Sequence, residues 1–292
     1  MSFRYILFAI LVALIWGVNF VVMKVGLLRL DPFLFGFLRF FIVLIILLPW
    51  LKIVQGAMFK LFILGNLIGG FQFALIFLGM DMTEHVSAMA VIVQMNIPMT
   101  LIMAHFILKE RMSYWRTSGV VIAFVGVLII TLDPEIMDEG IVILIILSAT
   151  AFYSIGVILM RRMTDIPVFQ TQAWIAFYSV PVFIIMTLIY EENQIGQLVN
   201  IDMDGILAVF YTSILSTIVG YGGMNFLIKK YPITLISPIL MMVPVFATGS
   251  AVLFLGEIIS LKFIIGSLVT LCGLGVINYR DWQLKRKARI IL

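Results

Sequence analysis

One charged side chain, Arg39, lies inside a long apolar stretch of this 292-residue chain, seven residues from the start of that stretch. A guanidinium group presents five N–H donors in a planar fork that matches a carboxylate. A charge in such a place needs a polar partner, water or a ligand. Arg39 is therefore either an anchor for the carboxylate of a small molecule or a structural tie, which snorkels toward the membrane surface or hydrogen-bonds to backbone carbonyls and to Asn19. Its place near one end of the stretch favours the tie.

Other polar and aromatic side chains also stand within apolar stretches, where they could recognise a small polar solute. Trp16 and Asn19 are three residues apart and share a helix face. Tyr178 follows Trp174 by four residues, and this pair could instead belong to an aromatic belt at a membrane interface. Mid-membrane amides have a second alternative, hydrogen bonding between helices, which contributes about 0.6–2 kcal/mol. The candidate binding residues are Trp16, Asn19, Arg39, Gln72, Gln94, Asn96, Tyr153, Tyr178, Tyr221, Asn225 and Ser237.

The chain offers little of what catalysis or metal binding requires. It has two histidines, His85 and His105, and one cysteine, Cys272, which stands in an apolar run. A single cysteine permits neither an intramolecular disulfide nor a cysteine-based metal cluster. The Gly-x-x-x-x-Gly-Lys-Ser/Thr motif that binds nucleotide phosphates does not occur. We therefore expect no enzyme, no cofactor, no metal site and no ATP-driven pumping by this chain alone.

The composition indicates that membrane-spanning helices position these residues. Hydrophobic residues make up 63% and charged residues 12% of the chain, against about 45–50% and 25% in soluble domains. A lipid-exposed backbone must be helical to satisfy its own hydrogen bonds. We predict an all-α integral membrane protein in which Pro98 bends one helix and Pro238 and Pro244 bend another. The ten predicted transmembrane spans are 5–28, 33–50, 59–80, 86–108, 114–131, 140–160, 168–189, 205–228, 233–254 and 262–279.

The charges of the loops alternate along the chain. Of the 19 Lys and Arg residues, 15 fall in one set of loops and terminal segments, and 12 of the 15 Asp and Glu residues fall in the other set. Basic residues collect on the cytoplasmic side of membrane proteins, so both termini are expected to be cytoplasmic. The net charge of +4 follows from this topology and not from a nucleic-acid site. The expected partners are a small-molecule substrate and the lipid bilayer, whose anionic headgroups attract the basic tail at 280–289.

The chain also repeats itself. The residues that recur at matching places are Glu110 with Glu257, Gly119 with Gly266, Gly126 with Gly273, and Trp16 with Tyr153. They predict two halves, 1–135 and 136–292, with five helices each. An odd number of helices inverts the second half relative to the membrane. Inverted repeats with a site near the bilayer midplane are the architecture of secondary transporters.

The two matching glutamates, Glu110 and Glu257, end spans at opposite membrane surfaces. Proton coupling is one interpretation of such carboxylates. We favour a structural role, in which each glutamate caps the following helix or pairs with Arg111 or Arg116.

Several short motifs follow one another in an order that resembles a known family. They are Trp16-Gly17-Val18-Asn19-Phe20, Leu38-Arg39-Phe40, Leu108-Lys109-Glu110-Arg111, the run from Thr217 to Gly222, and Leu255-Gly256-Glu257. The chain resembles the EamA family of the drug/metabolite transporter superfamily, and its amino-acid metabolite exporters in particular. The resemblance implies ten helices, an inverted repeat and a central cavity. It also implies export of amino acids or related small metabolites across a bacterial cytoplasmic (inner) membrane by alternating access.

Other functions are weighed against this expectation. Exchange or import of another metabolite, such as a nucleotide-like or adenosyl compound, is the main alternative. A channel is rejected, although Val219-Gly220-Tyr221-Gly222 matches the filter sequence of potassium channels. A filter occupies a re-entrant loop, whereas this run stands inside a continuous apolar stretch. A monomer is compatible with the predicted architecture.

Overall fold

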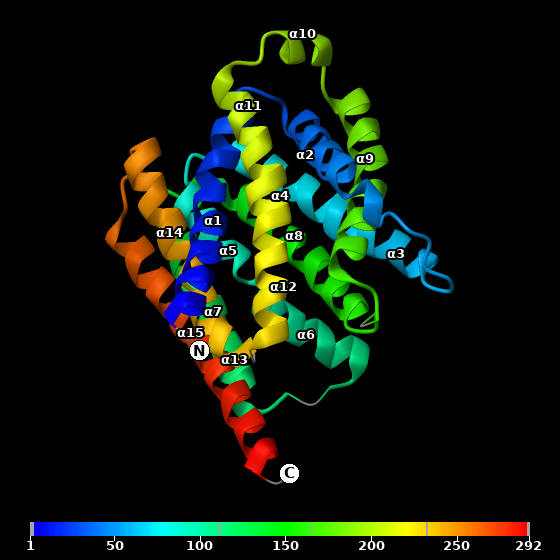
Figure 1. The fold of residues 1–292 in the computed structure, drawn as a ribbon. Helices are drawn as coiled ribbons and strands as arrows, with labels where there is room; N and C mark the ends of the chain where they lie inside the picture. Colours follow the sequence, from blue (N-terminus) through cyan, green and yellow to red (C-terminus); the bar gives the residue numbers. More distant parts are fainter. Residues whose placement is uncertain (1–2, 111, 164, 232, 291–292) are drawn as a thin grey trace.

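The chain folds into a bundle of helices, and Figure 1 shows their arrangement. The computed structural model describes residues 3–110, 112–163, 165–231 and 233–290. These residues form helices and short connections, and no strand occurs among them. Ten helical segments in this part of the chain are long and apolar enough to cross a membrane. The prediction of an all-α protein with ten spans is therefore confirmed for the described residues.

The first five spans comprise these elements: α1 (Phe3–Leu27); α2 (Pro32–Leu47) with η1 (Leu48–Trp50); α3 (Met58–Leu64), η2 (Gly65–Gln72) and α4 (Phe73–Met82); α5 (Val86–Val93) and α6 (Asn96–Leu108); and α7 (Tyr114–Thr131). The last five comprise η3 (Met137–Glu139) with α8 (Gly140–Met160); α9 (Val168–Tyr190); α11 (Met203–Phe210), η4 (Tyr211–Gly220) and α12 (Tyr221–Lys230); α13 (Ile233–Leu240), α14 (Val243–Ser250) and η5 (Ala251–Leu255); and α15 (Leu261–Ile290). A short helix, α10 (Gln194–Val199), joins α9 to α11.

Both ends of the chain lie at one end of the bundle, opposite α10 (Figure 1). An even number of spans requires this arrangement. The last helix is longer than predicted. The predicted span ends at residue 279, whereas α15 continues as one helix to Ile290. We call the two ends of the bundle the terminal end and the α10 end.

Three spans contain π-helical segments, and two of these segments stand at matching places. Those two are η2 in the third span and η4 in the eighth, while η5 ends the ninth. An offset of 147 residues moves residues 65–72 onto 212–219, inside η4, and moves Glu110 onto Glu257. A π-helix bonds residue i to i+5 and is found frequently at functional sites. These segments were predicted as ordinary helix, because hydrophobic patterning does not distinguish the two.

The fourth and ninth spans are each broken by a turn. Residues 94–95 separate α5 from α6, and residues 241–242 separate α13 from α14. Pro98 and Pro244 follow shortly after these turns, and neither has an N–H to continue the helical ladder. The offset of 147 residues relates the two turns as well. The predicted pair of bends is confirmed.

The helices α7 and α15 touch through backbone, and four glycines permit it. A Cβ atom on Gly126 would lie 2.6 Å from the carbonyl oxygen of Gly266, and one on Gly273 would lie 2.6 Å from that of Gly119. The contacts run in opposite directions along the two helices, so the helices are antiparallel. These are the glycines that the sequence comparison of the halves singled out, and close approach through small residues is how membrane helices pack.

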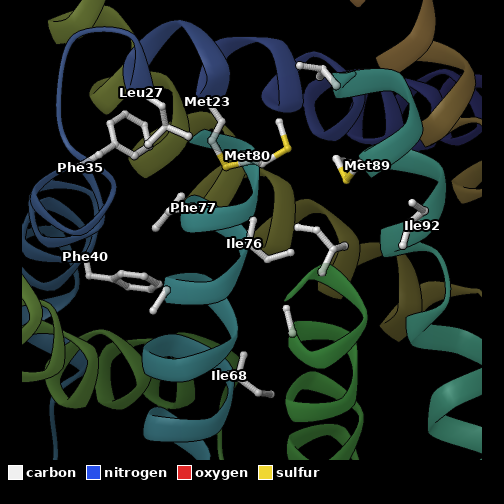
Figure 2. Close-up of a cluster of buried hydrophobic side chains, with 14 of the residues drawn as sticks. Met23, Leu27, Phe35, Phe40, Ile68, Ile76, Phe77, Met80, Met89 and Ile92 are labelled. Atoms are coloured by element: carbon white, nitrogen blue, oxygen red, sulfur yellow. The ribbon is translucent and has the colours of Figure 1, made fainter. Parts of the chain in front are cut away.

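Apolar side chains close the interior toward the α10 end. Figure 2 shows Met23, Phe35, Phe77, Met80 and Met89, which come from α1, α2, α4 and α5. All five are at most 2% exposed. The rings of Phe35 and Phe77 meet edge to face, with centroids 5.4 Å apart. We call this set the apolar plug.

The glycine contact makes a prediction about stability. The substitution Gly126→Ala places a methyl group 2.4 Å from the backbone nitrogen of Thr270, and overpacking of this kind costs about 1–3 kcal/mol. We expect a lower melting temperature for the detergent-solubilised variant, measured by size-exclusion chromatography after heating. The control is Gly249→Ala, because nothing lies within 4 Å of that added methyl group. Equal melting temperatures for the two variants would contradict the proposed contact.

Candidate functional site

Arg39 of α2 lies at the centre of the candidate site. Its side chain is buried, with 2% of its surface exposed. The Nη2 group donates a hydrogen bond to Thr217 Oγ1 at 3.0 Å. The guanidinium carbon lies 4.4 Å from the centre of the Phe73 ring, a distance at which a cation and an aromatic face attract. Arg39 thus connects the second and third spans to the eighth.

Two nitrogen atoms of Arg39 lack a partner in the described part of the chain. Nε and Nη1 are buried and form no hydrogen bond there. The described bond goes to Thr217, and not to Asn19 or a backbone carbonyl as the tie interpretation expected. Asn19 is also buried, and its Oδ1 atom has no partner among the described residues. Leaving buried polar groups unpaired costs about 1–3 kcal/mol for each group, and more for charged ones.

The π-helical segment η4 receives side chains from α1 and α2. Thr217 Oγ1, which accepts from Arg39, donates to the carbonyl of Thr212 at 2.8 Å. Trp16 Nε1 donates to the carbonyl of Ser216 at 3.1 Å. Tyr211 reaches in the other direction and donates to the carbonyl of Ile15 at 3.0 Å. These bonds join the first half of the chain to the second at mid-span.

Aromatic rings line the space next to Arg39. The rings of Trp16 and Tyr221 lie 5.3 Å apart. Gly220 permits this approach, because a Cβ atom there would lie 2.4 Å from Trp16 Nε1. Tyr221 lies within electrostatic range of both Arg39 and Tyr153. Both tyrosines are partly exposed.

A second polar group lies where α6 faces α8. Thr100 Oγ1 donates to the carbonyl of Asn96 at 2.6 Å, and Ser154 Oγ lies 3.3 Å from the same oxygen. Gln94 stands in the turn before α6 and is partly exposed. Gln72, at the end of η2, has a buried Oε1 atom without a described partner. These amides lie at the irregular places of their spans, where the backbone departs from the α-helix.

Two predicted residues, Tyr178 and Asn225, have their described contacts elsewhere, and the side chain of a third is not described. Tyr178 stacks on Trp174 at 5.6 Å and meets Phe62 at 5.3 Å, where α9 packs on α3. Trp174 Nε1 donates to the carbonyl of Lys52 at 2.9 Å, as expected of the alternative interfacial role. Asn225 donates to the carbonyl of Tyr221 in its own helix at 2.7 Å. Ser237 lies on α13, but its side chain is outside the described residues.

Sequence reasoning missed Thr217, Tyr211 and Ser154 as site residues. Thr217 appeared only as part of a motif. Hydroxyl groups in apolar spans usually bond to the carbonyl one turn before, as Ser154 does to Thr150 at 2.7 Å. Hydroxyls that bond to their own helix look the same in sequence as hydroxyls that reach another helix. A useful signal was the cluster of hydroxyl residues between 211 and 217, which is unusual in a membrane span.

The two matching glutamates have different partners. Glu257 accepts the N–H of Ser87 at 3.1 and 3.3 Å, so it caps α5 and not the helix that follows it. That part of the prediction is wrong, because the fold brings the start of the fourth span beside the end of the ninth. Glu110 forms an ion pair with Arg161 at 3.8 Å, whereas Arg111, one of its two expected partners, lies outside the described residues. Burial raises the pKa of Glu257 above its ordinary value, while the bonds to Ser87 and the nearby His85 oppose the shift.

A separate cavity of about 590 Å³ lies between α2, α4, α8 and α9 toward the α10 end. Its wall is apolar and includes Phe71, Leu75 and Phe152, with Glu191 and Glu192 at its edge. Glu191 accepts the N–H groups of Phe33 and Leu34 at the start of α2. None of the predicted binding residues lines this cavity. In the described part of the chain, no three His, Cys, Asp or Glu side chains come together as metal ligands would.

Known proteins resemble this chain over nearly its whole length. A protein of Salmonella typhimurium (strain LT2) described as a probable amino-acid metabolite efflux pump is 28% identical over 294 residues, and 97% of each chain is covered. A protein of Escherichia coli (strain K12) with the same description is 28% identical, with 91% of this chain and 92% of the relative covered. The uncharacterized transporter YoaV of Bacillus subtilis (strain 168) is 25% identical, with 90% and 92% covered.

A crystal structure shares the fold, with a TM-score of 0.65 over 97% of this chain and 99% of that one, at 14% identity. The sequence model of the EamA-like transporter family matches residues 3–132 and, a second time, residues 140–279. Two matches in tandem are consistent with a repeat. This multi-pass membrane protein therefore belongs to the EamA-like transporter family, which consists of transporters and not of enzymes.

Proposed function

We propose that this protein is a secondary transporter that exports amino acids or related small metabolites across the bacterial cytoplasmic membrane. The observation that carries this proposal is the position of the polar site. Arg39, Trp16 and Asn19 come from the first half, and Thr217 and Tyr221 come from the second. A site shared by two halves at mid-span is where a rocking carrier binds its substrate. The two relatives described as probable amino-acid metabolite efflux pumps support this substrate class.

The proposed topology places the terminal end in the cytoplasm. Fifteen of the 19 basic residues fall in the loops and tail at that end, as the positive-inside rule requires. We further propose that residues 1–135 and 136–292 form inverted repeats. The antiparallel contact of α7 with α15, and the offset of 147 residues between matching irregularities, support this inversion.

Alternating access would use the irregular segments as hinges. The apolar plug closes the site toward the α10 end, which is the outer side in this topology. Opening there requires α5 to separate from the ninth span, where Glu257 now holds the N–H of Ser87. Exchange or import of a nucleotide-like or adenosyl compound is the alternative function. It differs from the proposal in substrate and direction but uses the same carrier motion.

Counterflow in proteoliposomes tests the proposed function. Vesicles preloaded with one unlabelled compound are offered a trace of the same labelled compound, over a panel of cysteine, O-acetylserine, aromatic and branched amino acids, and adenosyl metabolites. We expect accumulation of an amino-acid class that its own unlabelled form inhibits. Accumulation of an adenosyl compound alone would favour the alternative, and no counterflow by correctly inserted protein would contradict both.

The amides of the site should matter for transport. Asn19→Ala and Gln94→Ala are each expected to lower the counterflow rate about three- to tenfold, because each removes a hydrogen-bonding group worth about 1 kcal/mol. Expression in the membrane should not change. The control is Asn200→Ala, since Asn200 bonds only within the exposed helix α10 in the described structure. Normal transport by both site variants would contradict the assignment of these amides.

The raised pKa of Glu257 predicts an effect of external acid on opening. A carboxyl whose pKa is raised by burial binds a proton more tightly in this closed conformation than in one that exposes it to water. Lowering the external pH toward the raised pKa therefore favours the closed conformation. We expect a cysteine at buried Met89, in a Cys272→Ala background, to react about threefold or more slowly with an impermeant maleimide near pH 5 than near pH 7.5.

Controls separate this effect from other titrations. The rates are normalised to a cysteine at exposed Ile195, because thiol reactivity itself depends on pH. His85 and Glu139 are the titratable groups near Glu257, so the experiment is repeated with His85→Gln and with Glu139→Gln. The substitution Glu257→Gln should abolish the pH dependence. Persistence of the full effect in Glu257→Gln would contradict the role of Glu257.

A further inference from the structure

The unpartnered atoms of the site form a chemically complementary set. On one side are the Nε and Nη1 donors of the Arg39 cation. On the other side are two neutral acceptors, Asn19 Oδ1 and Gln72 Oε1. All four atoms are buried and lack a hydrogen-bond partner among the described residues. In most folded proteins such groups are satisfied, so each of these atoms requires a ligand or water as its partner.

The charge of Arg39 is not matched by the protein. None of the acidic residues of the sequence falls in the middle of a span, and the second span itself contains no acidic residue. The faces of Phe73, Phe40 and Phe77 near the guanidinium stabilise a cation but accept no conventional hydrogen bond. An isolated buried charge is strongly unfavourable unless it is paired. The missing counter-charge is one negative charge that can accept several N–H bonds.

A carboxylate meets this requirement. Its two oxygens match the planar fork of a guanidinium, and its single charge balances one arginine. A phosphate dianion would leave a further negative charge without a described partner among aromatic rings. The neutral amide oxygens of Asn19 and Gln72 suit an ammonium group, which donates three N–H bonds and needs acceptors.

The elements that carry these atoms pack together. Gln72 directly precedes Phe73, whose ring lies against Arg39. Asn19 is one helical turn after Trp16, which is bonded to the π-segment that also holds Thr217. Tyr221 lies near both Arg39 and Tyr153. The helices that carry Asn19 and Arg39, α1 and α2, both contact α4 and η4.

We infer that this site binds the zwitterionic head of an α-amino acid, with Arg39 holding the carboxylate and the amides of Asn19 and Gln72 accepting from the ammonium group. This inference rests on the proposed transport function and names the part of the substrate that is recognised. The side chain of the amino acid would then lie against Trp16, Tyr153 and Tyr221. Thr217 is a positioning residue, because it holds the guanidinium in place through one nitrogen and leaves the others free.

Binding is tested on purified protein, without reliance on transport. The probes are L-phenylalanine, its amide, which lacks the carboxylate, and 3-phenylpropanoic acid, which lacks the ammonium group, with L-cysteine and cysteamine as a second set. The measurement is the concentration of each probe that gives half of its maximal thermal stabilisation. For the wild type we expect at least one amino acid to act at a concentration at least tenfold lower than both of its truncated analogues.

Variants assign the carboxylate contact to Arg39. Arg39→Met should remove the preference for the acid over the amide, and Arg39→Lys should retain only part of it, because an ammonium lacks the planar fork. Thr217→Val should weaken the preference while leaving the charge in place, which covers the case in which Arg39→Met fails to fold. The matched control is Arg29→Met, which removes an exposed arginine that pairs with Asp202 at the α10 end. It should preserve the preference.

The outcomes are distinct from those of the transport test. A folded Arg39→Met variant that keeps the full acid preference would overturn the inference, and so would a wild-type protein stabilised equally by acid and amide. The same holds if no amino acid stabilises the wild type, even where counterflow of another metabolite supports a carrier. Binding with the expected preference but without counterflow would support the inference about the site and contradict the proposed transport function.

Discussion

The structure depends on keeping one cation, Arg39, in an interior that provides no fixed negative charge for it. The protein meets this constraint with a hydrogen bond from Thr217 and with the faces of phenylalanine rings. Thr217 lies in the π-helical segment of the eighth span, where its hydroxyl donates to the carbonyl five residues before it. The same segment supplies the carbonyl of Ser216 that accepts from Trp16. The local irregularity of one helix is thus coupled to the contact between the two halves of the chain.

The architecture could be predicted from the sequence because lipid imposes simple rules. Ten apolar segments must be helices, and the charges of their loops set their direction. The glycines that repeat at equal offsets were found again as the contact of α7 with α15. Pro98 and Pro244 marked the broken spans correctly, because a proline lacks the N–H that continues the helical ladder. A proline alone does not decide the outcome, since Pro181 stands inside the unbroken helix α9.

The site was predictable in part. Arg39, Trp16 and Tyr221 were recognised because a charge or a large polar ring in an apolar stretch is unusual. The bond from Arg39 to Thr217 was not predicted, since it joins residues 178 positions apart. The stacking of Tyr178 on Trp174 was not predicted for a related reason: the sequence does not show whether a tyrosine within a span faces the interior or packs on a neighbouring ring. Which face of a helix points inward is decided by its neighbours, and a single sequence does not contain them.

The glycine contact between α7 and α15 has a mechanical consequence. Side chains can change rotamer and let two helices slide, whereas atoms of two backbones in direct contact have no such freedom. We therefore expect α7 and α15 to move together as one rigid unit. Any motion that opens one end of the bundle has to be taken up by the remaining spans, which are the ones that contain the π-segments and the proline turns. Because α7 and α15 cannot slide past each other, conformational change is confined to the other spans.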